Sequence, residues 1–180
     1  MSILKVARMG HPVLRRRARA VSPEEFGTAA FQQLVDDMIE TMREYSGVGL
    51  AAPQVHEGLR LFVAALGAAE EDEDDADALV LVNPEIQPVG EDEVEDWEGC
   101  LSIPDLRGLV PRADAIQVRA LGRDGRLVQL RATGFSARVI QHETDHLDGV
   151  LFLDRMRSFE SLCFLEEYSR YWGKELPPAE

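Results

Sequence analysis

Apolar residues recur every three or four positions in the first third of the chain. After Gly27 this spacing continues to Met42, as on one buried face of a helix, and Gly47 is placed to end that helix. Upstream, residues 22–25 (SPEE) offer an N-cap, a proline at the first helical position and a capping-box glutamate, so we expect the helix to begin there. The stripe is predicted to be core rather than a cofactor site, and it consists of Phe31, Leu34, Val35, Met38, Ile39 and Met42.

The middle of the chain has the shorter apolar runs that are typical of strands. Residues 59–66 (LRLFVAAL) and 79–83 (LVLVN) are predicted to be strands. Residues 116–121 and 126–132 flank the turn sequence GRDG at 122–125, which predicts a hairpin. Strands in the middle of the chain, with helices grouped before and after them, indicate antiparallel sheets.

Two more helices are expected in the last third of the chain. One covers residues 135–147 and is closed by Gly149, and the other covers residues 158–172. With strands between the helices, the order predicts an α+β fold: antiparallel sheets packed around the helix at 135–147, with a C-terminal helix. A length of 180 residues without repeats or a linker predicts a single domain over residues 1–180.

Composition indicates a soluble protein of a reducing compartment. No apolar run approaches the roughly 18 residues of a membrane span, so we expect no membrane association. Cys100 and Cys163 are too few for a disulfide framework, which favours the cytoplasm. The basic residues 1–20 raise the alternative of an organelle transit peptide, although Gly-His-Pro at 10–12 interrupts any amphipathic helix; no apolar region follows, which excludes a secretory signal.

The net charge of −14 is concentrated in two segments. Residues 70–77 hold seven acids and residues 91–98 hold six, and without them 20 acids face 19 bases. Residues 70–77 are therefore predicted to form a solvated, mobile loop rather than a metal or partner site. No basic face is evident, so we expect no direct nucleic-acid binding.

The sequence QHETDHLDG at 141–149 carries the first candidate chemistry. His142 and His146 are one helical turn apart, so both imidazoles can approach one ion. Glu143 lies about 100° around the helix axis, where a base acting on a water molecule would stand. An exposed polar helix end is the alternative, but the apolar residues just upstream would bury the first half of this helix. The pattern therefore favours a metal site that needs a third protein ligand.

Two of the known HExxH arrangements take the third ligand from downstream. The long metzincin form needs a histidine ten residues after the first, and position 152 is a phenylalanine, which excludes that form. A gluzincin peptidase would use a glutamate from a following helix. Glu160, Glu166 and Glu167 are candidates, so this alternative stays open.

Cys100, in EGCLS at 98–102, is a third possibility. Its thiolate would complete a Cys/His/His set, although a lone cysteine is more often a small buried hydrophobe. The preceding Gly99 and the acidic residues before it favour a metal ligand over a core residue.

A further motif is GVGLAAPQ at 47–54. Gly47 and Gly49 allow tight turns and the close approach of another chain, and the Gln54 amide could donate to an oxygen. Taken alone, this stretch could be an ordinary loop between a helix and a strand.

Together, GVGLAAPQ, EGCLS and QHETDHLDG closely resemble, in order and spacing, the three signature motifs of the peptide deformylase family. The resemblance extends to GHPVLR, LVPRADAI and GVLFLDR and covers about residues 3 to 157. It implies a metal-dependent hydrolase that removes the N-formyl group from N-formylmethionyl peptides of newly made proteins and releases formate. A gluzincin-like metallopeptidase and a non-catalytic binding module remain as alternatives.

The resemblance also implies a ligand set and a catalytic group. Cys100, His142 and His146 match the family's metal ligands, and Glu143 matches its acid/base. One divalent ion per chain is expected, natively Fe²⁺, while Zn²⁺, Ni²⁺ or Co²⁺ would also suit a thiolate and two imidazoles. Such an ion lowers the pKa of a bound water molecule to about 7, which allows attack on the formyl carbon at neutral pH.

Other matched positions concern the substrate. Gln54 and the backbone N–H of Leu101 match groups that stabilise the oxyanion, and Gly49 matches a backbone contact to a peptide added as an extra strand. Arg107 matches a contact to the peptide beyond the methionine. The methionine pocket matches Val48, Phe135, Arg138 and Val139, and we expect Arg138 to contribute its aliphatic stem.

The expected partner is the N-formylmethionyl nascent peptide, bound by a monomer. Some family members reach the ribosome through a basic C-terminal helix. Residues 158–180 hold five acids against two bases, so the sequence gives ribosome docking by that route little support.

Overall fold

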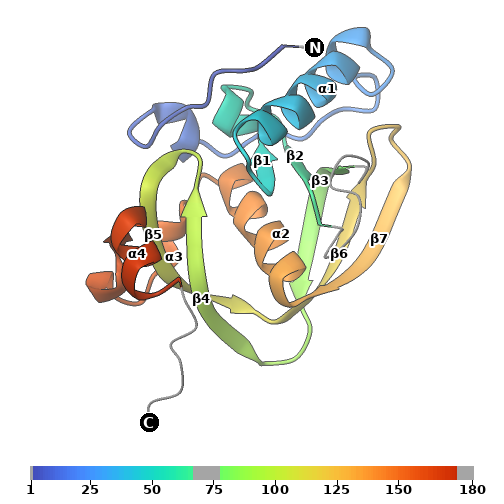
Figure 1. The fold of residues 1–180 in the computed structure, drawn as a ribbon. Helices are drawn as coiled ribbons and strands as arrows, with labels where there is room; N and C mark the ends of the chain where they lie inside the picture. The colour runs from blue at the N-terminus through green and yellow to red at the C-terminus, as the bar shows by residue number, and fades with distance from the viewer. Residues whose placement is uncertain (1, 67–77, 174–180) are drawn as a thin grey trace, which may run out of the picture.

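A computed structural model describes residues 2–66 and 78–173 (Figure 1). The predicted loop at 70–77 lies outside these described residues. The fold is α+β, as predicted, and α2 (Gly134–Leu147) runs through the middle of the molecule between two groups of strands. The other described helices are α1 (Ala29–Glu44), α3 (Phe152–Arg155) and α4 (Leu165–Tyr171).

The strands form two antiparallel sheets. The five-stranded sheet has the order β1-β2-β3-β6-β7, and the three-stranded sheet has the order β4-β5-β8. The strands are β1 (Gly49–Ala51), β2 (Leu61–Ala64), β3 (Leu79–Pro88), β4 (Glu93–Cys100), β5 (Ile103–Ala113), β6 (Ala115–Leu121), β7 (Leu127–Thr133) and β8 (Cys163–Phe164). The hairpin predicted around residues 122–125 is confirmed as β6–β7.

Apolar side chains fill both sides of the five-stranded sheet. The stripe of α1 packs with β1, β2 and β3, through buried residues such as Phe31 and Met38. The apolar face of α2 packs with the same sheet through Ile140 and Leu147, which are fully buried. A third cluster joins β5 to α3 and the N-terminal segment. Burial of α2 on its apolar face thus holds its polar face toward β4 and β5.

The first helix begins later than predicted. Residues 23–27 form a turn in which the Glu25 carboxylate accepts from the Ser22 backbone N–H (2.8 Å), so the capping contact forms without starting the helix. Arg19 binds the same carboxylate with two hydrogen bonds. The helix begins at Ala29, where Thr28 Oγ1 caps the Phe31 N–H at 3.2 Å. The predicted start of the helix at residues 22–25 is therefore wrong by about two helical turns.

The end of α2 is where Gly149 predicted it. Gly149 has a φ of +75°, and an added Cβ would lie 2.8 Å from the Arg15 carbonyl carbon. Both the left-handed backbone and the close approach of the N-terminal segment therefore require glycine here.

The predicted C-terminal helix is present, but it is shorter than the predicted range of 158–172. Residues Phe159–Ser161 form a 3₁₀ turn, and β8 then pairs with β5 through Leu106↔Phe164 and Arg107↔Cys163. Only Leu165–Tyr171 is helical, because the edge of β5 takes the backbone of the preceding residues into strand pairing. β1, β4 and β5 had not been predicted as strands. No helix in the described ranges has the length and apolar character needed to cross a membrane.

Candidate active site

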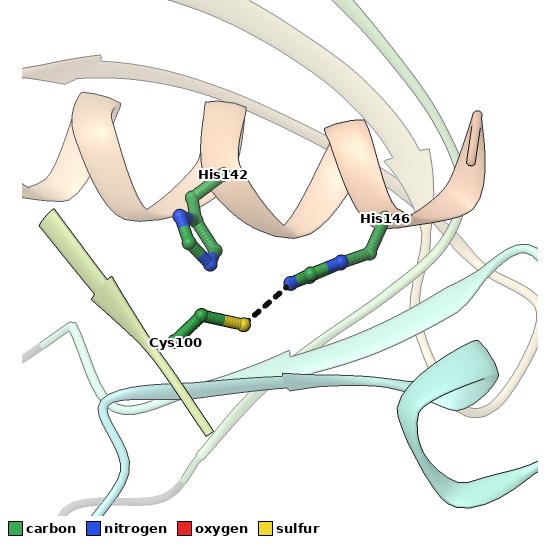
Figure 2. Close-up of side chains that lie close together, drawn as sticks. All are labelled: Cys100, His142 and His146. Atoms are coloured by element: carbon green, nitrogen blue, oxygen red, sulfur yellow. Dashed lines mark hydrogen bonds between the residues drawn. The ribbon is translucent and has the colours of Figure 1, made fainter. Parts of the chain in front are cut away.

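Cys100, His142 and His146 come together from β4 and α2 (Figure 2). Their ligand atoms lie within 4.8 Å of one another, and Cys100 Sγ is 3.2 Å from His146 Nε2. The two imidazoles project from successive turns of α2, with ring centroids 4.9 Å apart. The spacing predicted from the sequence therefore does bring these three side chains together.

The donor set suits a divalent transition metal. One sulfur and two nitrogens would supply three protein ligands, the number that catalytic metal sites use. Burial opposes ionisation of Cys100, but the adjacent His146 and His142 outweigh it and hold the pKa of the thiol well below its usual value. The thiolate is the form that binds a metal, so these residues fit the ion that the sequence implies.

Glu98 supports one of the two histidines from β4. Its Oε2 lies 2.9 Å from His142 Nδ1, and Arg112 binds the carboxylate with two hydrogen bonds of 2.9 and 3.0 Å. Burial opposes the charge on Glu98, but His142 and Arg112 outweigh it and lower its pKa to about 2. An ionised acceptor at Nδ1 fixes the tautomer that presents Nε2 to a metal. Sequence reasoning missed this role, although Glu98 opens the EGCLS motif.

The charges behind Glu98 form a continuous network. Arg112 donates to Asp145 Oδ2 at 2.6 Å, and Arg155 donates to Asp145 Oδ1 at 2.6 Å. These bonds join β5, α2 and α3. Buried ions persist in proteins when they are paired in this way, and the network fixes the polar face of α2 against the three-stranded sheet.

Glu143 is buried but, unlike Glu98, lacks a full set of partners. Its Oε2 makes no hydrogen bond within the described part of the chain. Burial is the largest influence on its pKa, which is raised above the ordinary value. An added Cβ on Gly49 would lie 2.7 Å from Glu143 Cδ, so glycine on β1 gives this carboxylate its space. A carboxyl group with a raised pKa and an oxygen free of hydrogen bonds is suited to taking up and releasing a proton.

Gln54 is held in one orientation beside the thiol. Its Oε1 accepts from the Ala51 N–H at 2.8 Å, while its Nε2 lies 3.3 Å from Ser102 Oγ and 3.5 Å from Cys100 Sγ. Because the carbonyl end is occupied, the amide end is the one presented to the site. Ser102 is fully buried and was also missed by the sequence reading.

A cleft of about 960 Å³ opens onto this cluster. His146 is buried at the site but does not border the cleft; the other predicted site residues do, and the structure thus brings all of them to one place. Those on the walls are Val48, Gly49, Gln54, Cys100, Leu101, Arg107, Phe135, Arg138, Val139, His142 and Glu143.

One wall of the cleft has the geometry for adding a strand. β1 is an edge strand that pairs with β2, and no strand among the described residues occupies its other side. An unpaired edge offers backbone donors and acceptors to an extended peptide. On another wall, the Arg107 guanidinium packs so closely on Gly99 that any Cβ there would overlap it.

The downstream glutamates do not join the cluster. Glu166 and Glu167 pair with Arg170 on α4, and Glu160 is exposed. Within the described ranges, the group able to hold a metal comprises Cys100, His142 and His146. The gluzincin alternative is therefore not favoured.

Three side chains that could hold a metal, with a buried carboxylate next to them in one cleft, are the arrangement expected of a metal-dependent hydrolase. Comparisons with known proteins specify it further. The model of the polypeptide deformylase family matches residues 3–161, and the chain belongs to this family. The chain is thus a hydrolase that removes the formyl group from nascent peptides, and the resemblance of the three motifs is confirmed.

Individual peptide deformylases are similar to this chain over most of its length. A peptide deformylase 2 of Nostoc sp. is 43% identical over 168 residues, which is 92% of this chain and 93% of the relative. A Met-Ala-Ser-bound class I type b peptide deformylase from Acinetobacter baumannii is 40% identical, with a TM-score of 0.79 over 87% of this chain and all of that chain. A peptide deformylase from Thermotoga maritima is 37% identical, with a TM-score of 0.79 over 88% of this chain and all of that chain.

Proposed function

We propose that Cys100, His142 and His146 hold one divalent ion and that Glu143 transfers the proton during hydrolysis of N-formylmethionyl peptides. The observation that supports this most directly is the meeting of three buried ligand atoms with a buried, incompletely bonded carboxylate in one cleft. When bound, the ion supplies Lewis-acid polarisation and makes a water molecule more acidic. We propose Fe²⁺ as the native ion; Zn²⁺, Ni²⁺ and Co²⁺ also suit the donor set.

Glu143 is proposed to carry the proton between water and the leaving amine. It takes a proton as the water oxygen adds to the formyl carbon, and it returns the proton to the nitrogen as the C–N bond breaks. The products are formate and a free N-terminal amine. Its raised pKa matches this exchange because a buried carboxylate is a stronger base than an exposed one.

Gln54 and the backbone N–H of Leu101 are proposed to stabilise the oxygen that gains negative charge. The fixed orientation of the Gln54 amide supports this role, since its donor end already faces the Cys100 thiol. A preorganised donor of this kind typically contributes about 3 kcal/mol to the transition state.

The substrate is proposed to bind along the free edge of β1, with Gly49 as a backbone contact. Val48, Phe135 and Val139 would enclose the methionine side chain, and Arg107 would contact the residues beyond it. The A. baumannii relative binds Met-Ala-Ser, which supports a peptide of this kind as the ligand of the cleft.

We further propose that the protein acts as a cytoplasmic monomer on nascent peptides. Docking on the ribosome through a basic C-terminal helix is not part of this proposal. Within its described residues, α4 carries Glu166 and Glu167 against Arg170.

The test is formate release from formyl-Met-Ala-Ser, measured anaerobically together with the metal content of the same sample. Acetyl-Met-Ala-Ser is the matched control, because it has an amide at the same place but a bulkier acyl group. We expect stoichiometric metal and selective release of formate. Metal-loaded, folded protein that leaves the formyl peptide intact would contradict the proposal.

The choice of iron has its own test. Iron-loaded protein is expected to lose activity in air as the ion and the Cys100 thiolate oxidise, whereas Ni²⁺- or Co²⁺-loaded protein should keep its turnover. Stoichiometric iron with unchanged activity in air would contradict the assignment of Fe²⁺.

A further inference from the structure

Arg138 is a buried charge whose partners lie outside the expected methionine pocket. It stands one turn before His142 on α2 and is 7% exposed. Its Nη1 donates to Glu98 Oε1 at 2.8 Å and to the Val110 carbonyl at 2.7 Å, and its Nη2 donates to the Val94 carbonyl at 2.6 Å. The guanidinium is therefore bound to β4, to β5 and to the carboxylate that holds His142.

A residue that only lined the methionine pocket would not need the hydrogen bonds that Arg138 makes. An aliphatic stem is enough to pack against a methionine side chain, and leucine or methionine would provide it without a buried charge. Burying an arginine is unfavourable unless its charge is paired and hydrogen-bonded. The planar fork of Arg138 satisfies this condition by bonding a carboxylate and two strands from two separate nitrogens, a geometry that the single ammonium nitrogen of lysine does not reproduce.

The Glu98 carboxylate depends on this arginine for its full set of bonds. Oε1 accepts from Arg112 Nε and Arg138 Nη1, while Oε2 accepts from Arg112 Nη2 and faces His142 Nδ1. Without Arg138, Oε1 keeps one donor, and the carboxylate can turn about its remaining contacts. Any such turn changes the orientation of the His142 imidazole.

The same arginine also spans the two elements that carry the ligands. Cys100 is the last residue of β4, whereas His142 and His146 lie on α2. The distance between β4 and α2 therefore sets the distance between sulfur and nitrogen donors. Arg138 bonds the Val94 carbonyl of β4 directly from α2.

We propose that Arg138 is a positioning residue of the metal centre: it orients His142 through Glu98 and holds β4 at the spacing from α2 that the three ligands require. The inference rests on the proposed ligand roles of Cys100, His142 and His146. It adds to them a residue that touches neither ion nor peptide through its charged group.

The experiment compares Co²⁺ binding by wild type, Arg138→Met and Arg138→Lys. Arg138→Met keeps the stem and is expected to weaken Co²⁺ binding about 10–100-fold in chelator competition, the usual range for loss of support behind a ligand. The thiolate-to-cobalt absorption band should shift, and kcat for formyl-Met-Ala-Ser should fall more than KM rises. Arg138→Lys should bind Co²⁺ with intermediate affinity. Arg123→Met is the control, because Arg123 also joins two elements, by bonding Gln32 and Asp36, but lies outside the cleft.

The outcomes separate this inference from the proposed function. Wild-type affinity and an unchanged cobalt spectrum in folded Arg138→Met would overturn the positioning role. If Arg138→Met fails to fold, Arg138→Lys decides, and wild-type Co²⁺ affinity in that variant would overturn it equally. If wild type itself binds no stoichiometric Co²⁺, or Cys100→Ala binds it as tightly, the proposed ligand set is wrong instead.

Discussion

Helices α2 and α4 both carry charged and apolar residues, yet they occupy opposite environments. Ten of the fourteen residues of α2 are buried, whereas none of the seven residues of α4 is. In Figure 1, α2 runs between the two groups of strands and α4 lies on the outside of the molecule. Arg138 and Asp145 of α2 are bound by side chains of β4 and β5, but the Arg170 guanidinium pairs with glutamates of its own helix.

The difference shows where a charge becomes chemically useful. Exposed pairs such as Arg170–Glu166 are screened by water and contribute about 0.5 kcal/mol. Buried groups interact in a lower dielectric, so neighbours shift their pKa strongly. On α2 the same burial that orders His142 through Glu98 leaves Glu143 with an unpaired oxygen. The site therefore combines paired charges around the proposed metal ligands with one incompletely bonded carboxyl group, that of Glu143, which we propose as the proton carrier.

The largest effect on metal content and formate release is expected at the buried group beside α2. Cys100→Ala removes the thiolate, and two imidazoles alone hold an ion weakly, so metal content and formate release should both fall to background. Cys163→Ala is the control, because that thiol is in β8, outside the metal-binding group. Both variants should be assayed for metal and formate on one sample. Full metal occupancy in Cys100→Ala would contradict the proposed role of the Cys100 thiolate as a metal ligand.

A smaller effect, on metal affinity, is expected when the Glu98 carboxylate that faces His142 is removed. Glu98→Gln removes the ionised acceptor at Nδ1 and takes the Glu98 carboxylate away from Arg112 and Arg138, so metal affinity should fall about 10–100-fold in chelator competition. Glu93→Gln is the control on the same strand, because Glu93 is exposed and pairs with Arg157 at the surface. Equal affinities of the two variants would show that Glu98 does not act through His142.

The contrast between buried α2 and exposed α4 also predicts how substitutions change the free energy of unfolding. Ile140 on α2 is completely buried, so Ile140→Ala should lower the free energy of unfolding by about 2–5 kcal/mol. Urea unfolding of the metal-loaded protein measures this loss. A loss below about 1 kcal/mol would mean that the apolar face of α2 does not anchor the site.

The smallest effect is expected beside α4. Phe164 is 65% exposed, so Phe164→Ala should change the free energy of unfolding by no more than about 0.5 kcal/mol. The same urea titration applies. A loss similar to that of Ile140→Ala would show that the C-terminal segment belongs to the core, contrary to its exposure here.

The two helices also show which parts of the structure could be predicted from sequence. The α2 pattern was reliable because its apolar period, its closing glycine and its histidine spacing all described one face of one helix. The C-terminal pattern misled because residues 163–164 pair with β5, a strand more than fifty residues away in sequence. No local signal reports such a contact.

The same reason explains what was missed in the site. The ligands and Glu143 lie in short motifs, so their spacing was readable. Glu98 acquires its role because the β4–β5 register places it opposite Gly108 and near Arg112. The acidic residues of β4 are mostly exposed, which made the strand resemble a loop. The partners of Arg138 likewise depend on tertiary packing, so the sequence indicated only its stem.

Glu143 is proposed to transfer a proton without holding the ion. The most direct measurement is a paired assay of bound metal and formate release in Glu143→Gln, which keeps the size of the side chain and removes its basic oxygen. We expect wild-type metal content with turnover reduced about 10²–10⁴-fold. Near-normal formate release, or a loss of metal as complete as in Cys100→Ala, would contradict it.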